Sequence, residues 1–341
     1  MNIVVLAGGL SPEREVSLTS GSLIANALME NGHRVLLLDV YEGMENPPDD
    51  ILSLFRTTGA YTHKVSEAIP DLDALRARCH NGNALIGPNV IEICRAADLA
   101  FLALHGAMGE NGQLQATLDA FGIRYTGSGY AGSLLAMDKD LSKRLLRDAG
   151  VPTPDWVYCK SADADADDII RRVGLPCVVK PCGCGSSVGV FMTDTREELA
   201  DALKKASAYG EILVEKKIVG RELTVGIVDG VTYPAVEIIP ETGFYDYKNK
   251  YQGTTREICP AEISEAAATY ASELTVRGFS ALRLEGYARF DFLLDGDGEL
   301  WCLEANTLPG MTPTSLLPLA AQTAGIDYRA LCEKLVALAM R

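Results

Sequence analysis

The sequence predicts an α/β fold in which an open parallel-sheet domain precedes two smaller α+β units. Residues 2–40 read as strand, helix and strand in turn, and strands dominate again from Arg221 onward. The 341 residues exceed what one compact core of ordinary size holds, which favours two or three domains. The predicted domains are residues 1–136, 137–218 and 219–341.

The first domain begins with a βαβ unit. Residues 2–7 form an apolar, β-branched run that is typical of a buried parallel strand. Residues 17–33 carry apolar side chains on one face and predict a helix, and residues 34–40 predict the second strand. Residues 97–106 predict another strand, and residues 112–122 predict the helix that follows it.

The second and third units follow a helix predicted at 137–150 and a stiff proline-containing segment at 151–154. In the second unit, strands are predicted at 175–181 and 211–220, with a helix at 196–210 between them. The elements predicted in the third unit are strands at 222–230, 231–239, 285–298 and 299–306, and a closing helix after Ile326.

The charge balance limits the class of partner. With 31 basic and 46 acidic residues the net charge is −15, so the surface repels nucleic-acid backbones and anionic lipid. We therefore expect small-molecule substrates and neither nucleic acid nor membrane as partner. An anionic substrate would need its own cluster of cations.

The cysteines and the apolar runs indicate the compartment. Nine cysteines are scattered, and only Cys182 and Cys184 lie close together, without the second pair or nearby histidine of a zinc site. The sequence shows no signal peptide, and no apolar run reaches about 18 residues. These features predict a cytoplasmic protein with reduced thiols.

A predicted hairpin near the carboxyl end carries candidate metal ligands. Strand alternation places Arg289 and Asp291 on one face, and a two-residue turn at Gly296-Asp297 would set Arg289 opposite Glu304. Asp291 and Glu304 are then diagonal neighbours, and Asn306 points the same way. These oxygen ligands suit Mg²⁺, although a surface Arg–Glu pair fits the same pattern.

The stretch KPCGCGSSVGV predicts an anion-binding loop. Lys180 ends an apolar strand, and the glycines up to Gly189 let backbone N–H groups and the hydroxyls of Ser186 and Ser187 surround phosphate oxygens. The loop is neither a Walker loop nor a dinucleotide turn. A flexible connector has similar composition.

Several polar residues stand at predicted strand or helix ends. Glu215 and Glu222 flank a hinge and suit ribose hydroxyls or an adenine amino group, or are solvated hinge charges. Glu15, near a glycine turn, could pair with a substrate ammonium, although capping by Glu13 or Glu15 competes. His105 ends a predicted parallel strand, where open α/β sheets bind ligands.

A segment rich in aromatic and basic residues, GFYDYKNKYQGTT, lacks apolar periodicity. It predicts a mobile loop whose Lys248, Lys250 and Tyr251 swing over a phosphate, or a loop whose tyrosines anchor packing.

Eight stretches in series closely resemble the D-alanine–D-alanine ligases of the ATP-grasp superfamily, from residue 3 to about 320. They are GGLSPEREVSLTSG, LHGAMGENG, MDK, VVKPCGCGSSVGV, VEKKIVGRELTV, FYDYKNKY, RFDF and EANTLPGMTPTSLLP. The resemblance implies an ATP-grasp fold of two α+β subdomains behind the N-terminal domain. It also implies a homodimer that joins two D-alanines through a D-alanyl phosphate and supplies a peptidoglycan precursor.

The resemblance assigns roles around ATP and two Mg²⁺ or Mn²⁺ ions. Lys139 and Lys180 match the lysines on the phosphates, and Ser187 matches the phosphate loop. The residues that match the adenine and ribose contacts are Glu215, Lys216, Ile218 and Glu222. The residues that match the metal ligands are Asp291, Glu304 and Asn306.

The resemblance also assigns roles around the amino acids. Glu15 and His105 match the residues beside the first D-alanine, and Glu15, Ser186 and Tyr251 match a hydrogen-bonded latch. Lys250 matches a lysine that reaches the transferring phosphate. The oxyanion-stabilising pair is matched by Arg289 and the Gly310 N–H, and the contacts to the second carboxylate by Ser315 and the Leu316 backbone.

The sequence departs from the family at Asn111, where an aspartate is commoner, and at the spacer cysteines Cys182 and Cys184. Their proximity to Lys180 predicts a lowered thiol pKa and sensitivity to oxidation.

Alternatives remain at the level of activity. A D-Ala–D-Ser or D-Ala–D-lactate ligase has the same motifs, and Tyr251 favours an amine as second nucleophile. A catalytically inactive nucleotide-binding regulator would predict damage among Arg289, Asp291, Glu304 and Asn306, and all four are intact. A dinucleotide oxidoreductase is disfavoured because the G-x-G-x-x-G spacing is missing.

Overall fold

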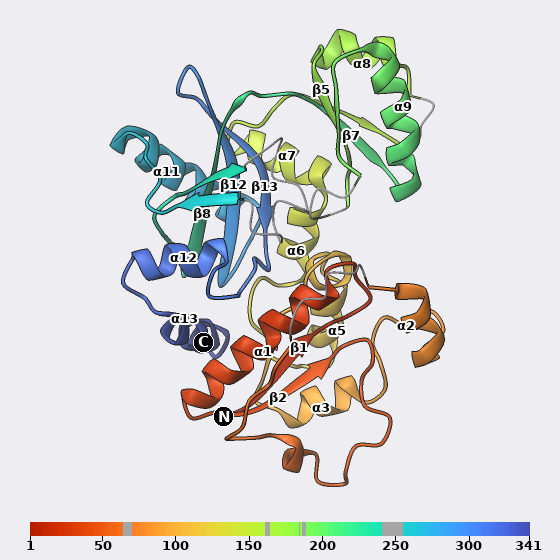
Figure 1. The fold of residues 1–341 in the computed structure, drawn as a ribbon, viewed down its shortest axis with the longest axis vertical. Coiled ribbons are helices and arrows are strands. Elements are labelled where there is room, and N and C mark those ends of the chain that lie inside the picture. The colour runs from red at the N-terminus through yellow and green to blue at the C-terminus, as the bar shows by residue number, and fades with distance from the viewer. Residues whose placement is uncertain (64–69, 161–163, 184, 186–188, 241–254) are drawn as a thin grey trace.

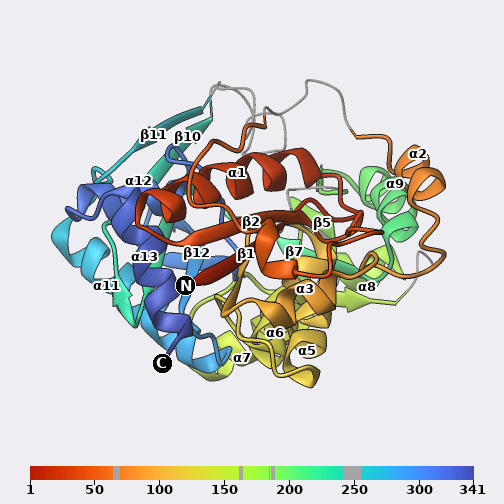
Figure 2. The same ribbon diagram turned by 90° about the horizontal axis from the view of Figure 1, so that it is seen from below.

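The computed structural model describes residues 1–63, 70–160, 164–183, 185, 189–240 and 255–341, and it confirms the predicted α/β class. The first sheet is parallel, in the order β2-β1-β3. Helix α1 lies over one face of this sheet, and α3 and α5 lie on the other (Figure 2). The elements of this unit are β1 (Asn2–Ala7), α1 (Arg14–Glu30), β2 (Arg34–Asp39), α3 (Val90–Ala96), β3 (Leu99–Leu102) and α5 (Gln113–Ala120).

A second sheet lies at the opposite end of the molecule (Figure 1). It is antiparallel, in the order β4-β7-β5-β6. Helices α8 and α9 pack on it through an apolar core that includes Ile169 and Leu199. The elements are β4 (Trp156–Cys159), α8 (Ala166–Val173), β5 (Cys177–Pro181), β6 (Phe191–Thr193), α9 (Arg196–Ala206) and β7 (Ile212–Lys216).

The third sheet has the order β11-β10-β8-β12-β13, and β9 pairs with β8. The strand predicted at 231–239 is two strands, because Pro234 has no N–H to donate to a ladder. Helix α11, where only strands were expected, also belongs to this unit. The elements are β8 (Gly220–Val228), β9 (Val231–Thr232), β10 (Val236–Pro240), β11 (Thr255–Ile258), α11 (Glu265–Ala281), β12 (Tyr287–Asp295) and β13 (Leu300–Asn306).

The register of the β12–β13 hairpin differs from the prediction. Three residues, not two, separate Asp295 from Glu299, whose carbonyl accepts from the Asp295 N–H at 3.0 Å. A bulge follows, because the register shifts between Asp291 and Phe292. As a result Arg289 pairs with Asn306, and Asp291 lies directly opposite Glu304.

The last helix crosses back to the first sheet. The core that holds α1 and the first sheet also contains Leu331 and Leu335 of α13. His33 Nε2 lies 2.9 Å from a carboxylate oxygen of Glu333. The domain boundaries at 136 and 218 remain predictions, and α13 packs in the first unit although it follows the third in sequence. The last two helices are α12 (Leu316–Thr323) and α13 (Tyr328–Ala339).

The described ranges contain further helices, and no helix in these ranges is long and apolar enough to cross a membrane. Their bounds are η1 (Ile51–Leu54), α2 (Leu72–Cys79), α4 (Ala107–Glu110), α6 (Tyr130–Met137), α7 (Lys139–Asp148) and η2 (Ser207–Tyr209).

Candidate nucleotide and substrate site

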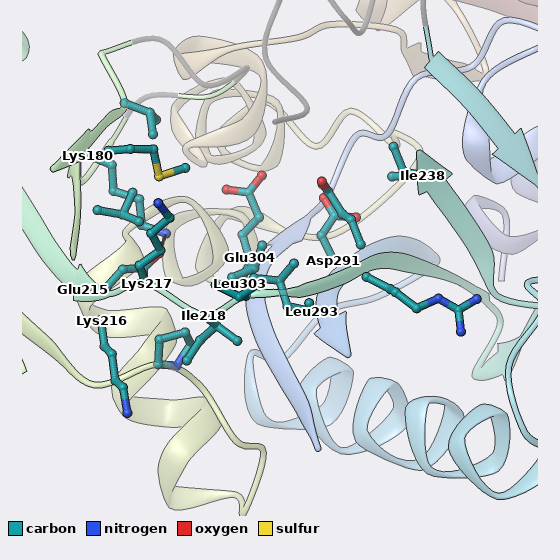
Figure 3. A pocket seen from close by; sticks show the side chains of 18 of the residues that line it. Lys180, Glu215, Lys216, Lys217, Ile218, Ile238, Asp291, Leu293, Leu303 and Glu304 are labelled. Atoms are coloured by element: carbon teal, nitrogen blue, oxygen red, sulfur yellow. Dashed lines mark ion pairs between the residues drawn. The ribbon is translucent and has the colours of Figure 1, made fainter. Parts of the chain in front are cut away.

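A cavity of about 550 Å³ lies between the second and third sheets. Apolar side chains from both sheets line it, and Figure 3 shows Leu293 and Leu303 beside Asp291 and Glu304, with the lysines around Glu215 on the other side of the view. A cavity that combines apolar walls with charged groups suits a purine base joined to phosphates. The predicted nucleotide residues that line it are Lys139, Lys180, Glu215, Lys216, Ile218 and Glu222.

A buried carboxylate with two ammonium partners forms the wall of this cavity. Glu215 on β7 lies 2.6 Å from Lys180 Nζ on β5 and 2.9 Å from Lys143 Nζ on α7. Burial raises the pKa of Glu215, but the two lysines outweigh that effect and hold it below its usual range. Glu215 therefore fixes Lys180 in place, as well as facing the cavity.

Lys143 was not singled out in the sequence. Its ammonium donates to Glu215 and to Thr153 Oγ1 at 2.6 Å, and the side chain is 1% exposed. Burial lowers the pKa of Lys143 to about 8. The sequence did hold a signal, because Lys143 follows Lys139 by four residues and so shares a helix face with it.

A second cavity of about 340 Å³ adjoins the first. Lys139 and Glu304 line both cavities, so the two spaces meet at these charges. This cavity gathers residues from segments that are far apart in the sequence. Its polar lining includes Glu13, His105, Glu110, Arg289, Asn306, Thr312, Thr314 and Ser315, together with Gly310 and Leu316.

The predicted metal ligands lie where the cavities meet. Asp291 and Glu304 are opposite each other on paired strands, and their carboxylates are side by side in Figure 3. Arg289 donates to both oxygens of Asp291, at 2.9 and 2.8 Å, and Asn306 Oδ1 accepts from the Leu308 N–H at 3.1 Å. The described residues contain no group of three or more His, Cys, Asp or Glu that could hold a metal. Two carboxylates and an amide oxygen nevertheless fit Mg²⁺, which uses few protein ligands beside phosphate oxygens.

His105 and Glu110 form a desolvated part of the second cavity. Burial lowers the pKa of His105, and its Nε2 has no hydrogen-bond partner among the described residues. Burial and then the charge of Glu13 raise the pKa of Glu110 to about 8, although its carboxylate accepts from the Gly106 N–H at 2.7 Å. At neutral pH this wall is thus less charged than its composition suggests.

Glu15 lies outside the lining of the second cavity, and Glu13 takes that place. One oxygen of Glu15 is 2.8 Å from His63 Nε2 and the other is 3.8 Å from Arg14 Nε. Two residues correspond to about 200° of helical rotation, so the two glutamates at the start of α1 face different ways. The sequence predicted a carboxylate at this position but did not distinguish Glu13 from Glu15.

The loop between β13 and α12 brings Gly310 against Ser315. A Cβ at Gly310 would lie 2.9 Å from Ser315 Oγ, so only glycine fits without a shift. Ser315 Oγ accepts from the Thr312 N–H at 3.1 Å. Asn111 lies away from the cavity lining, and its Oδ1 accepts from the Gln113 N–H at 3.0 Å, a role that aspartate could also fill.

Some predicted residues lie outside the described ranges: Cys184, Ser186, Ser187, Lys248, Lys250 and Tyr251. For Cys182, the predicted low thiol pKa is wrong. The side chain is buried, and burial raises its pKa to about 12, which outweighs Lys139 nearby. The described cysteines are all free.

Comparisons with known proteins identify the family. Residues 2–128 match the family model described as D-ala D-ala ligase N-terminus, and residues 145–337 match the one described as D-ala D-ala ligase C-terminus. A D-alanine--D-alanine ligase of Pediococcus pentosaceus is 41% identical, over 98% of this chain and 97% of its own length. One from Lacticaseibacillus casei is 39% identical, over 96% of this chain and 92% of its own.

Solved structures share the fold over the whole chain. A D-alanine--D-alanine ligase from Bacillus anthracis is 31% identical with a TM-score of 0.77, covering 100% of this chain and 98% of that one. A D-Ala:D-Ser ligase from Enterococcus faecalis is 27% identical with a TM-score of 0.79, covering 99% of each. These neighbours confirm the ATP-grasp fold that the resemblance implied. The chain therefore belongs to the D-alanine–D-alanine ligase family.

Proposed function

We propose that this chain joins two D-alanines at the expense of ATP, through a D-alanyl phosphate. The observation that carries the proposal is the junction of the two cavities at Lys139 and Glu304. A nucleotide in the first cavity points its terminal phosphate at a carboxylate held in the second. Phosphoryl transfer between them requires positioning and compensation of negative charge, which this junction supplies.

The nucleotide side uses the residues of the first cavity. Lys139 and Lys180 bind phosphate oxygens, and Glu215 holds Lys180 in position. Glu222 and the backbone from Lys216 to Ile218 contact ribose and adenine. Ser187 remains a proposed phosphate contact from the glycine-rich loop.

Asp291, Glu304 and Asn306 would hold two Mg²⁺ or Mn²⁺ ions. When bound, these ions neutralise the charge of the phosphate oxygens that face them. The chain's own residues set where they bind, since the pairing of β12 with β13 fixes Asp291 opposite Glu304.

In the second cavity, Glu13 replaces Glu15 as the proposed partner of the first D-alanine's ammonium, and His105 lies beside it. A carboxylate oxygen of this D-alanine bonds to the terminal phosphorus, and ADP leaves with the electrons of the broken P–O bond. The amine of the second D-alanine then attacks the carbonyl carbon, inorganic phosphate leaves, and the amine loses a proton.

Charge that develops during acyl transfer is stabilised by the Arg289 guanidinium and the Gly310 N–H. Ser315 and the Leu316 N–H bind the carboxylate of the second D-alanine. Ser186, Lys250 and Tyr251 are proposed to cover the phosphates. Glu15, which contacts His63, is not assigned to the hydrogen-bonded latch with Ser186 and Tyr251. Excluding water protects the acyl phosphate from hydrolysis.

The test is ATP turnover with magnesium and a panel of D-amino and D-hydroxy acids, with products identified by mass. We expect D-alanyl-D-alanine, ADP and phosphate in equal amounts. Absence of any dipeptide product with saturating magnesium and ATP would overturn the proposal.

D-serine is the second candidate for the acceptor, because a D-Ala:D-Ser ligase is among the solved structures that share the fold. The same panel separates the two, since each product has its own mass. We further propose that the protein is a cytoplasmic homodimer that supplies a peptidoglycan precursor. Light scattering of the purified protein tests the dimer.

A further inference from the structure

Three hydroxyl groups form a chain on the loop between β13 and α12. Thr314 Oγ1 lies 3.3 Å from Thr312 Oγ1, which lies 2.8 Å from Ser315 Oγ. All three residues line the second cavity. We call these hydroxyls the hydroxyl chain. Within the described ranges no carboxylate or carbonyl accepts a hydrogen bond from these hydroxyls, so their protons remain available to one another and to a ligand.

The loop holds the hydroxyl chain in a fixed place. The Met311 side chain is buried, and the Met311 carbonyl accepts from Tyr328 Oη of α13 at 2.7 Å. The Ser315 N–H donates to the Thr312 carbonyl at 2.9 Å, and the Thr312 N–H donates back to Ser315 Oγ. The Gly310 backbone approaches Ser315 Oγ on its other side, where an added Cβ would lie only 2.9 Å away.

When a carboxylate is bound, the number of available protons allows hydrogen-bond donation along the hydroxyl chain in only one direction. A carboxylate only accepts, so Ser315 must give it its single proton. One lone pair of Ser315 Oγ already accepts from the Thr312 N–H, which leaves one for the Thr312 hydroxyl. Thr312 then accepts from Thr314. Each hydroxyl in such a series polarises the next, which strengthens the terminal bond to the anion.

We propose that Thr312 is a positioning residue for the acceptor amino acid: its hydroxyl orients and polarises Ser315 toward the acceptor's carboxylate. This inference rests on the proposed function, because it assigns the second cavity to the acceptor. Thr314 acts through Thr312 and has the smaller effect.

The experiment is a competition between two acceptors in one reaction, D-alanine and D-alaninamide, with D-alanine as donor. The amide lacks the carboxylate, and the two products differ in mass. In Thr312→Val we expect the preference for D-alanine over the amide to fall about three- to tenfold, the range of one neutral hydrogen bond. Thr312→Ser restores the hydroxyl and should restore the preference.

Two further variants complete the design. Thr323→Val makes the same chemical change in α12, where the hydroxyl donates to the Leu319 carbonyl, and should leave the preference unchanged. If Thr312→Val yields too little product, Thr314→Val carries the test, with a smaller fall of about two- to threefold.

Two results would overturn the inference. One is an unchanged preference in both valine variants. The other is an equal loss of both products together with weaker ATP binding, which indicates a purely structural role. If the unaltered protein makes no D-alanyl-D-alanine at all, the proposed function itself fails, and that outcome is visible before any variant is compared.

Discussion

At the scale of single residues, the site depends on charges that are paired before any ligand arrives. Glu215 lies between Lys143 and Lys180, and Asp291 lies against Arg289. Pairing offsets part of the free-energy cost of removing these charges from water, and it keeps the side chains from rotating freely when the nucleotide binds. The lysine and arginine side chains are therefore ordered when the protein folds, and little conformational entropy is lost from them when the nucleotide binds.

Glu304 should be indispensable for metal-dependent turnover. Glu304→Gln keeps the shape of the side chain but removes the charge at the junction of the two cavities. We expect turnover to fall about 100-fold or more and the magnesium dependence to shift to higher concentration. Rates are measured over a magnesium titration.

Glu299→Gln is the matched control, because Glu299 is exposed in the hairpin turn of the same strand pair. An unchanged magnesium profile in Glu304→Gln would refute the metal assignment.

Glu110 should make stability depend on pH. Burial and Glu13 raise its pKa from 4.5 to about 8, so folding favours the protonated carboxyl. That contribution is complete below pH 4.5 and is lost as pH rises through 8, with a slope of at most about 1.4 kcal/mol per pH unit. Urea unfolding between pH 5 and 8.5 should show this slope, and Glu110→Gln should flatten it. Equal slopes in both proteins would contradict the assignment.

At the scale of secondary-structure elements, the bulge in the β12–β13 hairpin shapes the site. In a regular strand Leu303 and Glu304 would point to opposite faces. Here both line the nucleotide cavity, while Cys302 pairs with Phe292 in the core. One extra residue thus supplies an apolar wall and a carboxylate side by side.

Deleting Leu303 should remove an apolar wall of the nucleotide cavity but keep the two carboxylates aligned. With the bulge gone, Glu304 follows Cys302 directly, so the pairing of Phe292 with Cys302 leaves Glu304 opposite Asp291. We expect weaker ATP binding with dipeptide formation retained at saturating ATP, and a circular dichroism spectrum that stays native-like. Leu303→Ala keeps the bulge and is the control, with a similar loss of ATP affinity. Loss of all dipeptide formation in the deletion variant alone would show that the bulge itself is required.

Some elements follow from the sequence more directly than others. Apolar runs such as residues 2–7 and 34–40 marked strands correctly, because parallel strands are buried on both faces. Helix α11 was missed, although Ser264 caps it and alanines follow, because the surrounding strands dominated the interpretation. The predicted hairpin register was wrong because the loop length and the bulge each shift the pairing by one residue. Neither feature can be predicted from the alternation of apolar and polar residues.

At the scale of the whole molecule, the site forms where distant parts of the chain converge. Glu13, His105, Lys139 and Arg289 come from separate elements and line one cavity. Family motifs identified most of these residues without their geometry. They did not indicate Lys143 or decide between Glu13 and Glu15, since the direction of a helix's first turn depends on how it packs.

A nucleotide that contacts both sheets should stabilise the whole chain. ATP with magnesium at about 100 times its dissociation constant should raise the free energy of unfolding by about 2.7 kcal/mol. Thermal unfolding with and without the nucleotide measures this. Magnesium without nucleotide serves as the control, and an unchanged melting temperature at saturating ATP would contradict the nucleotide site.

The return of α13 to the first sheet has a consequence for biosynthesis. Until residues 328–339 have been translated, the surface of α1 that they cover is open to solvent. Chaperones and proteases therefore meet an exposed apolar patch until these residues have emerged and packed. A premature stop upstream of α13 should leave a product that is cleared rather than a shortened ligase.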